Sequence, residues 1–429
     1  MTADTIFALS SGAPPAAIGV VRLSGPDAGA AVTRLSGMAL PPARRAVVRR
    51  LRDGRGDLLD QALVLWLPGP GSATGEDMAE LHCHGGRAVI AAVERALADL
   101  PGCRRAEPGE FTRRAFANGR IDLAEAEGLG DLLAAETELQ RRAAAQLVEG
   151  RFSAQVNRWR HALLGLAASV EAALDFAEDD GIAGLPSSFS RQVRELADEL
   201  ESWLGRPRAE RLKDGVRVVI AGPPNSGKST LFNALVEDEA AITSPVAGTT
   251  RDALERPIAL SGVPFTLVDT AGLREHGADS IELEGIRRAR GHASAADLVL
   301  WLGPEGEGPD GASVLEIDAR IDEAGHAPKH GPAARLSAAT GSGLEELRAL
   351  LLDRARVLLP RPGDMALNGR QAELIGLARQ ALRSAAQGGD ELVIAENLRH
   401  ARLAFDRLLG RAATEDMLDA LFARFCIGK

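Results

Sequence analysis

The residues that point most directly to chemistry lie near the middle of the chain, at 222–229. They read Gly-Pro-Pro-Asn-Ser-Gly-Lys-Ser, the spacing of a phosphate-binding loop. Backbone N–H groups of such a loop, and the N-terminus of the helix after it, attract phosphate. Lys228 is placed to reach the β- and γ-phosphates, and the Ser229 hydroxyl to ligate Mg²⁺. We expect a nucleoside triphosphate to contact Asn225, Ser226, Gly227, Lys228, Ser229 and Thr230.

Two further motifs narrow the class of nucleotide-binding protein. Asp269-Thr270-Ala271-Gly272 follows the apolar run Phe265–Val268. An aspartate at a strand end there holds Mg²⁺ through water, and Gly272 offers its N–H to the γ-phosphate. Thr250, in the polar stretch 248–252, is the candidate for a second hydroxyl on Mg²⁺, engaged only when the γ-phosphate is present. The order of these motifs is typical of GTPases rather than ATPases.

The motif that reads guanine departs from the usual Asn-Lys-x-Asp. The strand expected at Ser313–Asp318 is followed by Ala319-Arg320-Ile321-Asp322. Asp322 keeps the carboxylate that accepts from guanine, Arg320 replaces the lysine stem over the phosphate loop, and Ala319 lacks the asparagine amide. A register in which Asp318 reads the base stays open. The last guanine-contacting loop is expected at Ser337 and Ala338.

Hydrolysis needs a substitute for a group that small signalling GTPases carry. Leu273 stands where a glutamine would orient the attacking water, and it cannot do so. Asn225, inside the phosphate loop, is a candidate ligand for a monovalent cation, and backbone carbonyls of Ser244–Thr249 complete its shell. A carboxylate, Glu282 or Glu284, is then available to orient the water.

The hydrophobic pattern supplies the elements that must position these motifs. Residues 213–357 alternate strands and helices, as a parallel sheet requires. Residues 1–117 mix short strand-like runs with the helical run Arg87–Leu100, which indicates an α+β domain. Residues 118–212 and 358–429 carry amphipathic helices. We therefore expect a multidomain fold: an α+β N-terminal domain, an all-α helical domain built from both flanks, and an inserted α/β P-loop GTPase domain.

Composition limits the cellular setting and the partners. The 429 residues are 45% hydrophobic, enough for about three folded domains. No stretch reaches the ~20 apolar residues of a membrane span, and the N-terminus lacks a signal-peptide pattern. Three cysteines cannot build a disulfide framework, so we expect a cytoplasmic protein without membrane contact. The net charge of −10 disfavours unaided nucleic-acid binding but permits RNA bound jointly with a basic partner.

Cys426, four residues from the end, has three interpretations from sequence. The residues after it, Ile427, Gly428 and Lys429, fit a prenylation signal poorly. A terminal tail with a buried thiol is the plainest interpretation. A reactive cysteine carried by a flexible arm is the third.

From end to end, the chain resembles the MnmE (also called TrmE) family of tRNA-modification GTPases. The combination and order of the matching segments carry the resemblance. Besides the GTPase motifs, they are 4–6, 19–26, 74–77 with Glu80, 84–86, 108–112, 114–116, 120–127, 248–252 and 426–429.

The resemblance implies a cytoplasmic enzyme that acts with MnmG (also called GidA), a partner that uses FAD and NADH. The pair places an aminomethyl or carboxymethylaminomethyl group on carbon 5 of the wobble uridine of certain tRNAs. A homodimer and a heterotetramer with MnmG are implied, with tRNA bound jointly. The one-carbon unit comes from a tetrahydrofolate, 5,10-methylene- or 5-formyl-, held by the N-terminal dimerisation domain. Its folate-contacting positions fall on Arg22, Glu80 and Arg120.

The resemblance also implies how hydrolysis is activated. K⁺ bridges Asn225 and the switch loop and replaces an arginine finger, while Mg²⁺ falls on Ser229 and Thr250. The family's water-orienting glutamate matches Glu282 within residues 281–286. Cys426 takes the role of a C-terminal cysteine needed for modification. The switch-loop positions for K⁺ are Ser244, Val246 and Thr249.

These features give one mechanistic hypothesis and two rivals. GTP and K⁺ bring the two GTPase domains of a dimer together, and hydrolysis releases them. One rival is a GTPase that only times an assembly such as ribosome maturation; such proteins usually add a basic RNA-binding module. The other is a free-standing folate aminomethyltransferase. Dependence of the modification on the flavin partner would separate the main hypothesis from this rival.

Overall fold

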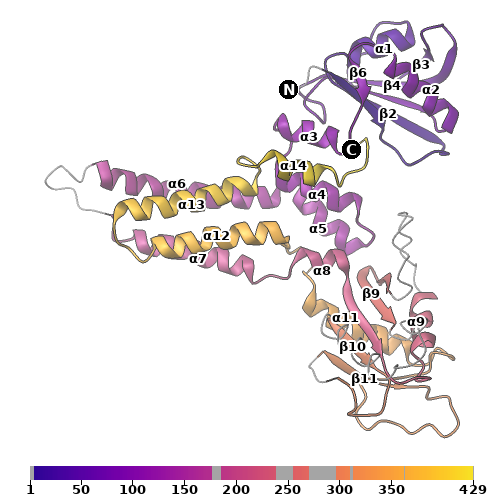
Figure 1. Ribbon diagram of the computed structural model, residues 1–429, viewed down its shortest axis with the longest axis vertical. Coiled ribbons are helices and arrows are strands. Elements are labelled where there is room, and N and C mark those ends of the chain that lie inside the picture. Colours follow the sequence, from indigo (N-terminus) through magenta and orange to yellow (C-terminus); the bar gives the residue numbers. More distant parts are fainter. Residues whose placement is uncertain are drawn as a thin grey trace, which may run out of the picture. The chain divides into compact units, whose positions relative to one another are not determined.

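The structure is a computed structural model that describes residues 4–175, 185–237, 255–269, 296–309, 313–361 and 363–428. The chain forms two compact units, residues 1–130 with 406–429, and residues 131–405 (Figure 1). The expected fold class is confirmed: an α+β N-terminal part, long helices, and an α/β domain around the phosphate loop. Within the described residues, no helix is both long and apolar enough to cross a bilayer.

The N-terminal part is a six-stranded sheet with two helices on one face. The sheet order is β3-β4-β5-β2-β1-β6, antiparallel except for the β1–β6 pair. The strands are β1 (Thr5–Leu9), β2 (Ile18–Ser24), β3 (Val47–Arg52), β4 (Leu58–Leu67), β5 (Met78–His84) and β6 (Cys103–Arg105). Helices α1 (Ala28–Ser36) and α2 (Arg87–Ala98) share the core with alternate strand residues such as Val21, Leu23 and Leu81.

The sequence predicted α2 but not α1. Helix α1 buries Ala28, Ala31, Val32 and Leu35, which lie on one helical face. Three of its nine residues are alanine and one is glycine, so the hydrophobic period is weak when read from sequence. The small residues have a use in packing, because a Cβ at Gly29 would lie 3.1 Å from the Trp66 ring.

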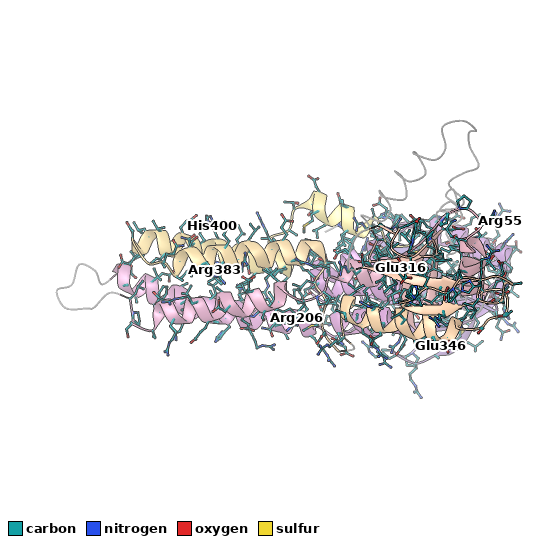
Figure 2. The ribbon with its side chains drawn as sticks, turned by 90° about the horizontal axis from the view of Figure 1, so that it is seen from below. Arg55, Arg206, Glu316, Glu346, Arg383 and His400 are labelled. Atoms are coloured by element: carbon teal, nitrogen blue, oxygen red, sulfur yellow. The ribbon has the colours of Figure 1, made fainter. Side chains whose placement is uncertain are left out.

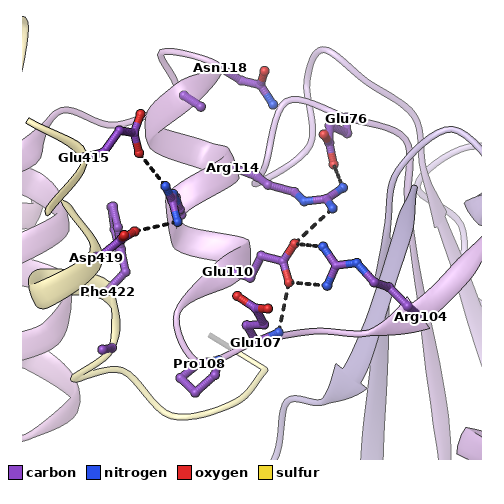
Figure 3. A pocket seen from close by; sticks show the side chains of 13 residues that line it. Glu76, Arg104, Glu107, Pro108, Glu110, Arg114, Asn118, Glu415, Asp419 and Phe422 are labelled. Carbon is purple, nitrogen blue, oxygen red and sulfur yellow. Dashed lines mark hydrogen bonds and ion pairs between the residues drawn. The ribbon is translucent and has the colours of Figure 1, made fainter. Parts of the chain in front are cut away.

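A network of ion pairs fixes helix α3 (Glu110–Ala117) to the N-terminal sheet (Figure 3). Arg114, only 8% exposed, pairs with Asp4 at 3.0 Å, Glu110 at 3.1 Å and Glu76 at 3.2 Å. Arg104 also pairs with Glu110. Because each charge has several partners, burial of the guanidinium is compensated.

The C-terminal segment of the chain returns to this part of the molecule. From α3, Arg113 reaches Glu415 at 2.6 Å and Asp419 at 2.8 Å on α14 (Glu415–Phe422). Helix α14 shares a small core with α4 (Leu123–Leu133). The α3 network and α14 line a cavity of about 750 Å³ (Figure 3). Beyond α14, Ile427 pairs with Pro108, and the Ser10 hydroxyl donates to the Gly428 carbonyl at 2.8 Å.

The long helices come from both sides of the α/β domain. They are α5 (Glu138–Val148), α6 (Arg151–Asp175), α7 (Phe189–Leu204), α12 (Gly369–Ala385) and α13 (Glu391–Leu408). Helices α7 and α12 pack together, with Arg383 3.4 Å from Asp198 and Glu201 (Figures 1 and 2). Trp159 is buried between aromatic rings, 5.2 Å from Trp203 and 5.9 Å from Phe405.

The α/β domain is built on a second six-stranded sheet, with the order β12-β11-β10-β7-β9-β8. All neighbours are parallel except β8 and β9. The strands are β7 (Val216–Ala221), β8 (Glu255–Leu260), β9 (Val263–Asp269), β10 (Leu298–Trp301), β11 (Val314–Ala319) and β12 (Ala334–Leu336). Among the described residues of this domain, the helices are α8 (Ala209–Asp214), α9 (Lys228–Glu237) and α11 (Leu344–Leu358). The carboxyl ends of β7, β9 and β11 therefore meet at one edge, where ligands of such sheets bind.

The chain enters and leaves this domain at one place. Arg208, before α8, forms a parallel bridge with Leu367, before α12. The Ala209 N–H donates to the Leu367 carbonyl at 3.0 Å. Gln140 completes the capping box of α5 with Thr137, and its amide also donates to the Leu212 carbonyl at 3.0 Å. These contacts close the α/β insertion against the long helices.

Replacing Glu110 with glutamine tests the α3 network. We expect Glu110→Gln to lower the free energy of unfolding by about 1–3 kcal/mol at neutral pH, because charge-assisted hydrogen bonds to Arg104 and Arg114 are weakened. Chemical denaturation followed by circular dichroism measures this. The control is Glu107→Gln, an exposed glutamate beside it, for which a change within about 0.5 kcal/mol is expected.

The same variant has a defined pH dependence. Burial acts to raise the pKa of Glu110, but hydrogen bonds from Arg104, the Glu107 N–H and Arg114 outweigh it, so the pKa lies below the usual value of a glutamate. A depressed carboxylate pKa stabilises the fold above the unfolded-state value and ceases to do so as pH falls through the folded value. The difference in free energy of unfolding between wild type and Glu110→Gln should be constant near neutral pH and shrink below about pH 4.5. A difference independent of pH would contradict this account.

Candidate functional site

The phosphate loop begins where the buried strand β7 ends and closes where helix α9 begins. Gly222, Asn225 and Gly227 adopt positive φ angles of 154°, 62° and 93°. A Cβ at Gly222 would lie 2.8 Å from the Ser226 hydroxyl oxygen and 3.2 Å from the Gly303 nitrogen. Only glycine fits there, and asparagine is among the few other residues that tolerate the left-handed region. The sequence thus forces the tight turn that precedes α9.

Two side chains at the start of α9 have the chemistry that a Mg²⁺–phosphate complex needs. Lys228 is 7% exposed, and its ammonium donates to the Pro223 carbonyl within the loop at 2.7 Å. The Ser229 hydroxyl donates to Asp269 Oδ2, at the end of β9, at 2.9 Å. A hydroxyl and a carboxylate side by side are oxygen ligands, which Mg²⁺ prefers. The residues present therefore fit a magnesium ion bound with a phosphate.

The loop after β11 is joined to the phosphate loop through Arg320. Its guanidinium donates from Nη1 to the Asn225 carbonyl, and its stem lies over Gly227, where a Cβ would be 3.4 Å from Arg320 Cγ. Glu323 holds the guanidinium on its other side. Arg320 thus lies over the phosphate loop, the place expected for the lysine of the usual motif.

Of the two candidate base readers, only Asp322 is at the surface. Asp318 lies inside β11, is 2% exposed, and pairs with His326 at 2.9 Å. Asp322 is exposed and accepts a hydrogen bond from Ser337, which lowers its pKa and keeps it ionised. Ser337 is buried, its hydroxyl accepts from the Thr340 N–H at 3.2 Å, and Ala338 packs on the domain core. The arrangement presents one fixed carboxylate near the nucleotide loop, and its role stays a prediction.

Several predicted site residues lie outside the described residues. They are Ser244, Val246, Thr249, Thr250, Thr270, Ala271, Gly272, Glu282 and its alternative Glu284. Their roles stay predictions from the sequence. Thr230 is exposed in α9, next to Ser229.

The N-terminal sheet brings Arg22 and Glu80 together. Arg22 on β2 donates from Nε and Nη2 to Glu80 Oε1 on β5, at 3.1 and 3.0 Å. His82, which sequence reasoning did not select, contacts Glu80 Oε2 at 3.1 Å. Burial acts to raise the pKa of Glu80, but the His82 hydrogen bond and the Arg22 charge outweigh it and lower the pKa. The period of two along a strand places Glu80 and His82 on one face, a signal that could have identified His82.

Arg120, also expected to bind folate, and Cys426, expected to act in modification, lie elsewhere in the same unit. Arg120 is exposed after α3, and its stem packs beside Gly75, where a Cβ would be 3.2 Å from Arg120 Cγ. Cys426 is exposed in the tail that follows α14, and its carbonyl accepts from the Gly109 N–H at 3.5 Å. The contacts of the described residues do not join Arg120 or Cys426 to the Arg22–Glu80 pair.

Comparison with known proteins gives consistent matches along the whole chain. Family models of the MnmE helical domain and of the GTP-binding protein TrmE N-terminus match residues 123–426 and 5–120. A tRNA modification GTPase MnmE of Erythrobacter litoralis is 64% identical over 426 residues, 99% of this chain and 100% of that protein. A tRNA modification GTPase MnmE of Novosphingobium aromaticivorans is 60% identical over 436 residues, which cover 99% of this chain and 100% of that protein. A solved G domain of the T. maritima FeoB iron transporter is 29% identical, covers 33% of this chain and 98% of that chain, and has a TM-score of 0.24.

Arg320 provides a direct test of the nucleotide site. We expect Arg320→Ala to raise the Kd for GTP and GDP about tenfold, because the bond to the Asn225 carbonyl and the cover over Gly227 are lost together. Titration with a fluorescent guanine nucleotide measures both constants. Arg335→Ala, an exposed arginine on β12, is the matched control and should bind like wild type. Equal Kd values for wild type and Arg320→Ala would show that Arg320 does not support the loop.

Proposed function

We propose, since the chain belongs to the MnmE family of tRNA modification GTPases, that its GTPase cycle drives modification of the wobble uridine of tRNA. The group added would be aminomethyl or carboxymethylaminomethyl at carbon 5. One observation carries the proposal. A single chain combines a phosphate loop bonded to Arg320 with an N-terminal domain in which Glu80 is held by Arg22 and His82. A GTPase that only times an assembly has no need of the second site.

In the proposed nucleotide site, each residue of the chain has a distinct task. Lys228 and the loop N–H groups hold the phosphates, and Ser229 with Thr250 ligates Mg²⁺, which neutralises charge on the phosphates. Asp269 holds the ion through water. Asp322 accepts from guanine, and Ser337 and Ala338 close over the base. The remaining contacts are assigned to Asn225, Ser226, Gly227, Thr230, Ser244, Thr249, Thr270, Ala271 and Gly272.

Activation of hydrolysis is assigned to a monovalent cation. Asn225, together with Ser244, Val246 and Thr249, would hold K⁺ where other GTPases receive an arginine. Asn225 adopts a positive φ and its carbonyl is already engaged by Arg320, so its side-chain amide is the group left for a cation. Glu282 would orient the water. GTP and K⁺ would bring the GTPase domains of a homodimer together, and hydrolysis would separate them.

The modification chemistry is assigned to the N-terminal and helical parts. Arg22, Glu80 and Arg120 would hold a tetrahydrofolate that supplies the one-carbon unit, and Cys426 would act in modification. The flavoprotein MnmG, using FAD and NADH, would join the homodimer in a cytoplasmic heterotetramer that binds tRNA jointly. The proposed domain bounds are 1–117, 118–212 with 358–429, and 213–357.

Cation dependence tests the activation mechanism. We expect GTP hydrolysis to be faster in KCl than in NaCl of equal ionic strength by at least about tenfold, since K⁺ would supply the charge of an arginine finger. Asn225→Ala should remove the difference while GDP still binds. Steady-state phosphate release measures the rates, with ATP as the control substrate. Equal rates in the two salts would rule out the assigned role of Asn225.

Reconstitution tests the proposed function itself. The complete mixture contains the full chain, MnmG with FAD and NADH, undermodified tRNA, GTP, KCl, 5,10-methylene-tetrahydrofolate as the carbon donor, and ammonium or glycine as the amine. It should yield a modified wobble uridine, detected by mass spectrometry of nucleosides. Lys228→Ala should abolish the product, because the phosphates lose their lysine. Product formed without MnmG would favour the free-standing transferase. Active GTPase without any product in the complete mixture would favour an assembly-timing role.

A further inference from the structure

Glu80 lies on the face of the N-terminal sheet opposite helices α1 and α2. Its strand neighbours Ala79 and Leu81 point into the core that these helices cover. Successive residues of a strand alternate between faces, so Glu80 and His82 share the other face, and the register pairs Arg22 with Glu80 on it. The Glu80 side chain is 17% exposed and the His82 side chain 29%. The three groups form a cluster that is partly buried and still reached by solvent.

The hydrogen bonds define which groups are still able to accept or donate. An ionised carboxylate only accepts, so His82 contacts Glu80 Oε2 through a protonated Nε2. Oε1 already accepts twice from Arg22, whereas Oε2 accepts once from His82. Each carboxylate oxygen has two lone pairs. Glu80 therefore offers one acceptor position, on Oε2.

Arg22 supplies the complementary donors. A guanidinium has about five N–H groups, and the bonds to Oε1 use only two of them. The ring of Phe111, on α3, has its centroid 5.9 Å from the Arg22 guanidinium carbon and covers one side of it. The cluster thus places one carboxylate acceptor next to fixed N–H donors. That pattern matches a lactam edge, in which a ring N–H stands beside a ring C=O.

We propose that His82 is a positioning residue that fixes Glu80 so that the Arg22–Glu80 pair reads the lactam edge of a pterin ring. The ring N–H donates to Glu80 Oε2 and the ring carbonyl accepts from Arg22. Without a donor at position 82, the Glu80 carboxylate is free to rotate, or Arg22 is free to bond both of its oxygens. Either change removes the single acceptor position on Oε2. This assignment rests on the proposed folate function of the N-terminal domain.

The donor at position 82 is tested with the intact chain and 5-formyl-tetrahydrofolate, a stable reduced folate, by isothermal titration calorimetry. His82→Leu should raise the Kd about tenfold, the effect of losing a hydrogen bond to a charged group. His82→Gln retains an N–H donor and should stay within about threefold of wild type. The control is His84→Leu, on the same face of the same strand, where the ring contacts Asp60 instead. Unchanged thermal unfolding of each variant excludes loss of the fold.

Ligand choice supplies a readout that a purely structural role would not change. The 4-amino analogue of the reduced folate replaces the carbonyl by a donor, which faces the N–H groups of Arg22. Wild type should bind the 4-oxo compound more tightly than the 4-amino compound, and His82→Leu should narrow that preference. Wild-type affinity or preference in His82→Leu, or equal losses in the glutamine and leucine variants, would overturn the role of His82. No binding by wild type would instead overturn the proposed folate function.

Discussion

An inserted domain must leave and re-enter its host at nearly the same point, and this constraint shapes the larger unit. The bridge between Arg208 and Leu367 meets it directly, because the entering and leaving segments hydrogen-bond to each other. Gln140, part of the capping box of α5, adds a second attachment by donating to the Leu212 carbonyl. Leu139 and Ala143 of α5 also pack against the core of the α/β domain. A change in that domain thus has a covalent and a packed route into the long helices.

Much of the fold could be predicted because its signals are local. Strand β7 has the bounds predicted from its apolar run, and α9 follows the glycine turn as the loop motif requires. Helix α1 was missed because alanine and glycine give a weak hydrophobic period. The return of Ile427 and Gly428 to Pro108 and Ser10 joins residues hundreds of positions apart. No local pattern encodes such a contact.

The candidate site likewise has parts that local sequence signals predict and parts that they do not. The phosphate-loop motif and the Asp269 motif predicted that Ser229 and Asp269 lie close together, because parallel strands end at one edge of the sheet. The choice between Asp318 and Asp322 as the guanine reader required knowing the residue at which β11 ends. The sequence pattern does not fix that end to a single residue. The partner of Glu80 across the sheet likewise depends on strand register. The period of two is enough to place His82 on the same face as Glu80, but nothing in the sequence shows which face of β5 helices α1 and α2 cover.

The tryptophans are distributed so that each part of the protein has its own optical signal. The chain has four tryptophans and no tyrosine. Trp66 belongs to the N-terminal sheet, Trp159 and Trp203 to the long helices, and Trp301 to the α/β domain. Gly303 lies against both the Trp301 ring and Pro223 of the phosphate loop. The intrinsic emission of the α/β domain therefore arises beside its nucleotide loop, and single-tryptophan variants would let each domain be followed separately without an attached dye.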